Sequence, residues 1–210
     1  MRTNEFVKVL AADAHGTVPP QRLLISAALA SGAVLCALFV ALVGVRPDLL
    51  SALADPRVAF KFAFAGSAVL AASAYGMRAV RPEDRSSPLA FALPVTALLG
   101  VAIALELSLT SRAEWSSLAQ GASPSRCLTT IFVLSLPATA ALIAAMRSGA
   151  PRRPTLAGAA AGLGGGAIGA AVFALYCTND STLFVAVWYV LGMLISGAIG
   201  AAVGASKLAW

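Results

Sequence analysis

The sequence predicts an all-α integral membrane protein, a bundle of six transmembrane helices with both termini in the cytoplasm. Of its 210 residues, 59% are hydrophobic and only 11% are charged, and the mean hydropathy is +0.85. Soluble globular domains are more polar than this. Six apolar stretches are each long enough to cross a hydrocarbon core, which needs roughly 20 helical residues. Basic residues gather in alternate loops, which gives the bundle an orientation.

The predicted spans cover most of the chain and leave five short loops between them. The spans run over residues 23–45, 58–77, 89–110, 127–146, 156–176 and 183–204. Residues 1–22 then form a cytoplasmic N-terminal segment, residues 23–204 the transmembrane domain and residues 205–210 a cytoplasmic tail. Because no clean small-residue cleavage site is associated with the first apolar run, we expect that run to be a span rather than a signal peptide.

The two sides of the predicted bundle differ in positive charge. One side carries ten basic residues: Arg2, Lys8, Arg22, Arg78, Arg81, Arg85, Arg147, Arg152, Arg153 and Lys207. The other side carries four: Arg46, Arg57, Arg112 and Arg126. The positive-inside rule places the richer side, with both termini, in the cytoplasm. Most of the net charge of +6 then reflects topology and contact with the lipid bilayer, so we expect no direct nucleic-acid partner.

The N-terminal segment contains a predicted short amphipathic helix over residues 3–14. Phe6, Val9 and Leu10 fall on one face at helical spacing, with Lys8 and Asp13 flanking it. Such a helix either lies flat on the inner leaflet as an anchor or offers its apolar face to the groove of a cytoplasmic partner. The residue pattern alone leaves both roles open.

Spans one to three carry few polar side chains. Cys36, in the middle of span one, is interpreted as a small buried hydrophobe. Lys61 lies near the start of span two and Glu106 near the end of span three, so both lie close to the outer boundary. We expect them to form an intramembrane ion pair or to extend separately to the interface, rather than to form a proton or ion path. Pro94 in span three and Pro137 in span four are expected to kink their helices.

Two cysteines lie where loops meet spans four and five. Cys127 opens span four and Cys177 closes span five, and the loop between these spans is cytoplasmic, so an antiparallel hairpin brings both thiols to one outer face. Three interpretations remain open: a structural disulfide, a pair that responds to redox change or transiently binds a soft metal ion, and two unrelated buried thiols.

Small residues recur every four positions in spans five and six. This pattern allows helix backbones to approach closely in lipid, and we expect it to serve packing within the bundle rather than a homodimer seam. The glycines concerned are Gly158, Gly162 and Gly166 in span five and Gly200 and Gly204 in span six.

The residue inventory argues against an enzyme. The only histidine, His15, lies in the N-terminal segment, so no Ser-His dyad forms within the membrane. The spans contain no pair of aspartates, the chain has no Cys-x-x-Cys motif, and no nucleotide fingerprint is present. We therefore expect neither catalysis nor a bound cofactor.

Several strings resemble the NrsF family, and the resemblance runs over nearly the whole chain. They comprise residues 45–49, 55–57 with Lys61, 127–137, 149–158 and 175–189. The resemblance implies a six-helix anti-sigma factor of the bacterial inner membrane, which holds an extracytoplasmic-function sigma factor of the sigma-F type through its cytoplasmic N-terminal segment. It also implies that Cys127 and Cys177 are an outward-facing pair that senses heavy metals or oxidative stress.

This resemblance favours the docking role of the N-terminal helix over the anchoring role. The resulting hypothesis is that Phe6, Lys8, Val9, Leu10 and Asp13 hold the sigma factor until the thiol pair is modified. Two alternatives predict different properties. A small-solute transporter or channel predicts a polar cavity, whereas an assembly protein joined through glycine seams predicts a defined oligomer.

Overall fold

A computed structural model describes Glu5 and residues 19–209, and this part of the chain is helical with no strand. Six of its helices are long and apolar enough to cross a membrane. In chain order they are α2 (Pro20–Leu42), α4 (Pro56–Ala79), α5 (Pro88–Leu109), α7 (Pro124–Met146), α8 (Pro154–Ala174) and a sixth made of α9 (Thr182–Phe184), the π-helical turn η2 (Val185–Tyr189) and α10 (Val190–Lys207). The predicted all-α fold class is confirmed.

Proline sets where most of the long helices begin. A proline occupies the first position of five of them: Pro20, Pro56, Pro88, Pro124 and Pro154. The first N–H groups of a helix have no partner within it, so a residue without an N–H is tolerated there, and its fixed φ suits the helix. This explains why these helices begin one to three residues before the predicted spans. Pro94 and Pro137 lie inside α5 and α7 without ending them.

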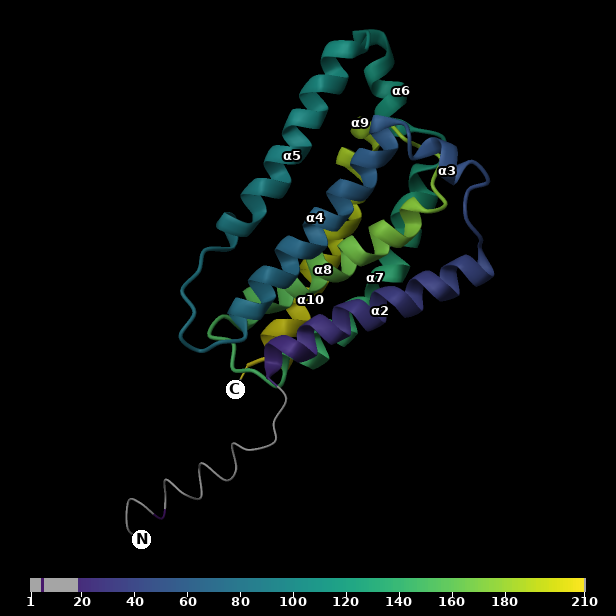
Figure 1. The fold of residues 1–210 in the computed structure, drawn as a ribbon. Coiled ribbons are helices and arrows are strands. Elements are labelled where there is room, and N and C mark those ends of the chain that lie inside the picture. The colour runs from purple at the N-terminus through teal and green to yellow at the C-terminus, as the bar shows by residue number, and fades with distance from the viewer. Residues whose placement is uncertain (1–4, 6–18, 210) are drawn as a thin grey trace.

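The bundle has two chemically different ends. The start of α2 and the end of α10 lie together at one end (Figure 1). We call this the basic end, because Arg78 in the last turn of α4 lies there, together with Arg81, Arg85, Arg147, Arg152 and Arg153 in the loops. The opposite end, which we call the cysteine end, carries Cys127, Cys177 and the short helices α3 (Leu49–Ala52), η1 (Arg112–Glu114) and α6 (Trp115–Gln120).

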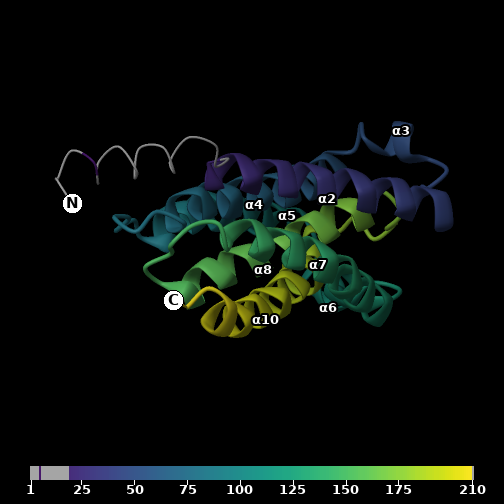
Figure 2. The same ribbon diagram turned by 90° about the horizontal axis from the view of Figure 1, so that it is seen from below.

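Helix α8 lies at the centre of the bundle, with α7 and α10 packed against it (Figures 1 and 2). Its glycines allow this close approach. A Cβ atom on Gly158 would lie 2.6 Å from the Cα atom of Gly204, and one on Gly166 would lie 2.8 Å from the Cα atom of Met193. On another face, a Cβ atom on Gly169 would lie 2.8 Å from the carbonyl oxygen of Ile131 in α7. The glycine repeat therefore serves packing inside the bundle.

Helix α5 lies along one side of the bundle, next to α4 (Figure 1). It packs mainly on α4 and α9, and Glu106 is its only buried residue. A helix that is apolar all round and exposed over most of its surface is suited to contact with lipid.

Candidate functional site at the cysteine end

The two cysteines that the sequence singles out both lie at the cysteine end. Cys127 is in the first turn of α7, and Cys177 lies three residues after Ala174, the last residue of α8. Both side chains are buried, with exposed fractions of 1% and 4%. Both are free thiols, as is the half-buried Cys36 in α2. A reagent therefore reaches this pair only when the surrounding structure opens.

The loop of residues 177–182 runs from the end of α8 to the first residue of α9. Two buried cations hold it in place. The carbonyl oxygen of Cys177 accepts a hydrogen bond from Lys61 Nζ at 2.9 Å and one from Arg46 Nη1 at 3.4 Å. Lys61 comes from α4 and is completely buried, and Arg46 comes from the segment after α2. The backbone of a predicted sensing residue is thus fixed directly by side chains of two other parts of the bundle.

Asp180 in the same loop neutralises both cations. Its Oδ1 atom lies 2.5 Å from Lys61 Nζ, and both of its carboxylate oxygens lie 2.9 Å from Arg46 Nη1. Arg46 also forms a two-point contact with Asp48, from Nε at 2.9 Å and from Nη2 at 2.8 Å. The hydrogen bonds that Arg46 donates to Asp48 raise the pKa of Arg46 above its usual range, with a further contribution from Asp180, and Arg46 lowers the pKa of Asp48. Arg46 therefore stays charged.

Glu106 holds the far end of the same loop. Its carboxylate accepts hydrogen bonds from the Thr182 backbone N–H at 2.6 Å and from the Ser181 hydroxyl at 3.1 Å. It also lies 3.5 Å from the half-exposed guanidinium of Arg57, which comes from the start of α4. A carboxylate that receives a backbone N–H at the first residue of a helix also stabilises the positive end of that helix. Glu106 thus anchors α9 to α5.

The predicted ion pair between Lys61 and Glu106 does not form. Within the described residues, Lys61 pairs with Asp180, and Glu106 pairs with Arg57. The two side chains do lie at the same end of the bundle, but the 177–182 loop offers each of them a nearer partner. A polar loop buried between helices has to satisfy its own backbone groups, and here these two charged side chains do so.

Sequence reasoning missed Asp180, Arg46 and Arg57 as members of this site. With Asp48, Lys61 and Glu106 they form a cluster of three cations and three carboxylates, which we call the charge cluster. A signal was present: the strings around Arg46, Arg57 and Asp180 are among those that resemble the family. Burying such a set is costly unless every charge is paired, which makes its geometry specific.

The Tyr189 side chain is buried at the cysteine end of the bundle. Tyr189 closes the π-helical turn η2, its side chain is fully buried, and its oxygen has no hydrogen-bond partner in the described part of the chain. A single π-helical turn inside an α-helix often marks a functional position.

The structure does not gather a full metal-binding set. Among residue 5 and residues 19–209, no group of three or more His, Cys, Asp or Glu side chains is arranged to hold a metal ion. The predicted docking residues of the N-terminal segment lie outside the described residues: Phe6, Lys8, Val9, Leu10 and Asp13.

Comparison with known proteins shows a match over nearly the whole chain. A family model described as "Negative regulator of sigma F" (NrsF) matches residues 10–210. A relative from Azospira oryzae named "Probable anti-sigma-F factor NrsF" is 37% identical over 217 residues, and one from Caulobacter vibrioides named "Anti-sigma-F factor NrsF" is 35% identical over 215 residues. Both alignments cover 100% of this chain and of the relative. No solved structure matches the chain.

Proposed function

Because the chain belongs to the NrsF family of negative regulators of sigma F, we propose that it is a membrane-embedded anti-sigma factor. It binds an extracytoplasmic-function sigma factor of the sigma-F type through its N-terminal segment and releases it when Cys127 and Cys177 are modified. The names of the two full-length relatives support the first part of this proposal. The contacts of the Cys177 carbonyl with Lys61 and Arg46 are the observation that carries the second.

We propose that the chain lies in the bacterial inner membrane, in an orientation set by the distribution of its own basic residues. Five arginines lie in the loops of the basic end, and Arg22, Arg78 and Lys207 lie in helices close to the same end. Loops rich in arginine and lysine face the cytoplasm. This orientation puts the N-terminal segment on the same side of the membrane as a sigma factor, and the two cysteines on the outer side.

The charge cluster offers a physical route from the thiols to the rest of the bundle. A change at Cys177 moves its carbonyl oxygen and therefore the cations that bind it. Lys61 belongs to α4, Arg46 follows α2, and Glu106 belongs to α5, so three helices are connected to one short loop. Oxidants and soft metal ions such as heavy metals react with the thiolate, which forms more readily in an exposed cysteine than in a buried one. Modification of the pair therefore favours a state in which this loop has opened.

Sigma-factor retention tests the first part of the proposal. Removing residues 1–14 should abolish the retention of the sigma factor at the membrane, because these residues carry the proposed docking face. Replacing Phe6, Val9 and Leu10 together with serine should have nearly the same effect, whereas Ala11→Ser, off that face, should leave retention unchanged. The measurement is the fraction of sigma factor in the membrane pellet. Undiminished retention by the truncated protein would refute the docking role.

The same assay tests the sensing role when a thiol reagent is added. The wild-type protein should release the sigma factor after treatment with Cd²⁺ or a mild oxidant. The double variant Cys127→Ser, Cys177→Ser should retain it under the same treatment, and Cys36→Ser should behave like the wild type. Release from the double variant equal to that from the wild type would show that the pair is not the sensor.

A transporter or channel is less well supported. Such a protein needs polar groups along a path near the middle of the membrane. The groove described below, which reaches that depth, is lined almost entirely by apolar side chains and contains neither Lys61 nor Glu106. The charge cluster lies instead at one end of the bundle.

A further inference from the structure

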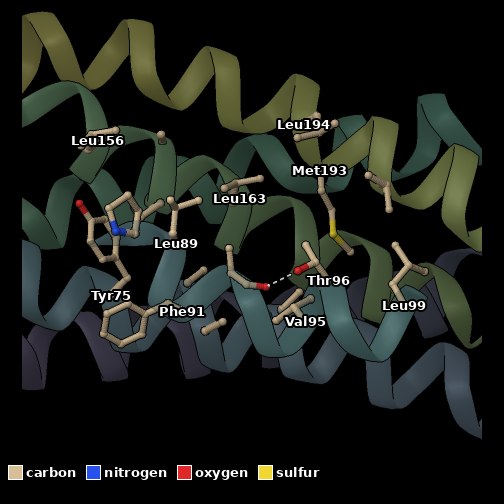
Figure 3. Close-up of a pocket in the computed structure, with 18 of the residues that line it drawn as sticks. Tyr75, Leu89, Phe91, Val95, Thr96, Leu99, Leu156, Leu163, Met193 and Leu194 are labelled. Carbon is tan, nitrogen blue, oxygen red and sulfur yellow. Dashed lines mark hydrogen bonds between the residues drawn. The ribbon is translucent and has the colours of Figure 1, made fainter. Parts of the chain in front are cut away.

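A groove of about 380 Å³ lies between α5 and the rest of the bundle. Its walls come from α4, α5, α8 and α10, and it exists because α5 packs mainly on α4 and α9. Figure 3 shows Met193 and Leu194 of α10 on one side of the groove and Val95 and Leu99 of α5 on the other. The groove begins at Tyr75 and Leu89 near the basic end and extends toward the middle of the helices.

The chemistry of the walls suits a hydrocarbon chain. Only two lining side chains carry a polar atom, namely Tyr75 and Thr96. The Thr96 hydroxyl is already used, because it donates to the carbonyl oxygens of Ala92 and Leu93 in its own helix. A polar ligand would therefore lose its hydrogen bonds to water without replacement, whereas an apolar chain would not. The groove is partly open, so acyl chains of a surrounding bilayer have access to it.

Three arginines lie beside the part of the groove that is nearest to the basic end of the bundle. Tyr75 lines the groove and also a small neighbouring pocket whose walls include Arg152 and Arg153. A third guanidinium, that of Arg78, lies 5.6 Å from the centre of the Phe91 ring, which is itself part of the groove wall. All three arginines are exposed.

The acidic side chain in the small pocket does not neutralise these cations directly. Asp84 accepts a hydrogen bond from the Ser86 hydroxyl at 2.6 Å, and no ion pair within 4 Å joins it to an arginine in the described part of the chain. The guanidinium groups of Arg152 and Arg153 are therefore available to an outside anion. Their planar donors match the geometry of a phosphate group, which binds them in a bidentate manner.

We propose that this groove binds one acyl chain of an anionic phospholipid, whose phosphate is held by Arg152 and Arg153 with Arg78 beside it. The apolar groove and the cations lie in the order in which a phospholipid presents its tail and its headgroup at a membrane surface. The proposal needs only the membrane embedding of the proposed function, and not the sigma factor. The bound chain fills the space between α5 and α10 and so supports a helix that has few contacts of its own.

Native mass spectrometry of the full chain in detergent tests the headgroup part. The probes are phosphatidylglycerol and phosphatidylcholine with identical acyl chains. We expect the wild type to bind phosphatidylglycerol at least tenfold more tightly. The double variant Arg152→Gln, Arg153→Gln should lose about fivefold in affinity for each arginine removed. The control Arg112→Gln, Arg126→Gln, which removes two exposed arginines from the cysteine end, should bind as the wild type does. Equal binding of the two lipids by the wild type would overturn the proposal.

A second pair of variants tests the groove itself. Ala159→Phe in α8 and Ala68→Phe in α4 each place a ring in the groove, and each should reduce the binding of phosphatidylglycerol at least tenfold. Ala30→Phe, on the exposed side of α2, adds the same ring elsewhere and should have no effect. Unchanged lipid binding by both filled variants would overturn the proposal, as would a lipid-free dimer whose formation the filled variants abolish. Because the arginine variants alter only exposed side chains, the headgroup test remains decisive even if a filled variant fails to fold.

Discussion

Asp180→Asn should lower the free energy of unfolding by about 3 kcal/mol, because it leaves the buried ammonium of Lys61 without a counter-ion. Lys61 has no exposed surface, and its other hydrogen-bond partner, the Cys177 carbonyl, is neutral. Removing one member of a buried ion pair is far more damaging than removing both. Unfolding in detergent by chemical denaturant measures the loss.

Two further variants separate this effect from a general loss of charge. Asp48→Asn also removes a carboxylate bound to Arg46, but that carboxylate is 56% exposed and Arg46 keeps Asp180, so the loss should be much smaller. Adding Lys61→Met to Asp180→Asn should restore most of the stability, because no unpaired charge then remains buried. If Asp180→Asn costs no more than Asp48→Asn, the charge cluster does not hold the loop as described.

Gly162→Ala should destabilise the bundle by about 1–3 kcal/mol, because the added methyl group meets backbone rather than side-chain atoms. Its Cβ atom would lie 2.8 Å from the Cα atom of Gly197 and closer still to the carbonyl oxygen of Ser196. A backbone atom cannot rotate out of the way, so α8 and α10 would have to separate.

Gly100→Ala is the matched control for this substitution. Gly100 lies within α5, and no heavy atom comes within 4 Å of the position that its Cβ atom would occupy. Replacing an unhindered helical glycine with alanine stabilises a protein by about 0.5–1 kcal/mol. Thermal unfolding of the two variants should therefore shift in opposite directions. A shift of the same sign and size in both would show that the seam between α8 and α10 is not closely packed.

The sequence predicts the fold class and the position of each span well, because both depend on local composition. Long apolar runs define the helices, and the glycine repeat of residues 158–166 identifies the face that packs against another helix. The first residues of the helices are predicted less accurately, since a hydropathy pattern does not show that a polar or weakly apolar stretch beginning with proline already belongs to the helix. The sequence predicts a loop where the short helix α6 forms between Trp115 and Gln120, because six residues are too few to show a periodic pattern.

The candidate site is predicted only in part, because depth in the membrane does not determine which helices are neighbours. Lys61 and Glu106 were correctly assigned to the same end of the bundle, yet each binds a different partner. Asp180 lies in a loop, where a charged residue ordinarily faces water, and the family resemblance of the string around it does not indicate which cations approach it. Such a contact depends on the tertiary arrangement of α2, α4 and α8.

The proposed function requires that the thiols at the cysteine end and the sigma factor bound by the N-terminal segment respond to one shared conformational equilibrium. If modification of the thiols weakens sigma-factor binding, then sigma-factor binding has to protect the thiols by the same factor. The most direct measurement is the alkylation rate of Cys127 and Cys177 in membranes of the Cys36→Ser variant, with and without saturating sigma factor. We expect slower alkylation when the sigma factor is bound. Equal rates with and without it would contradict the coupling between the two ends.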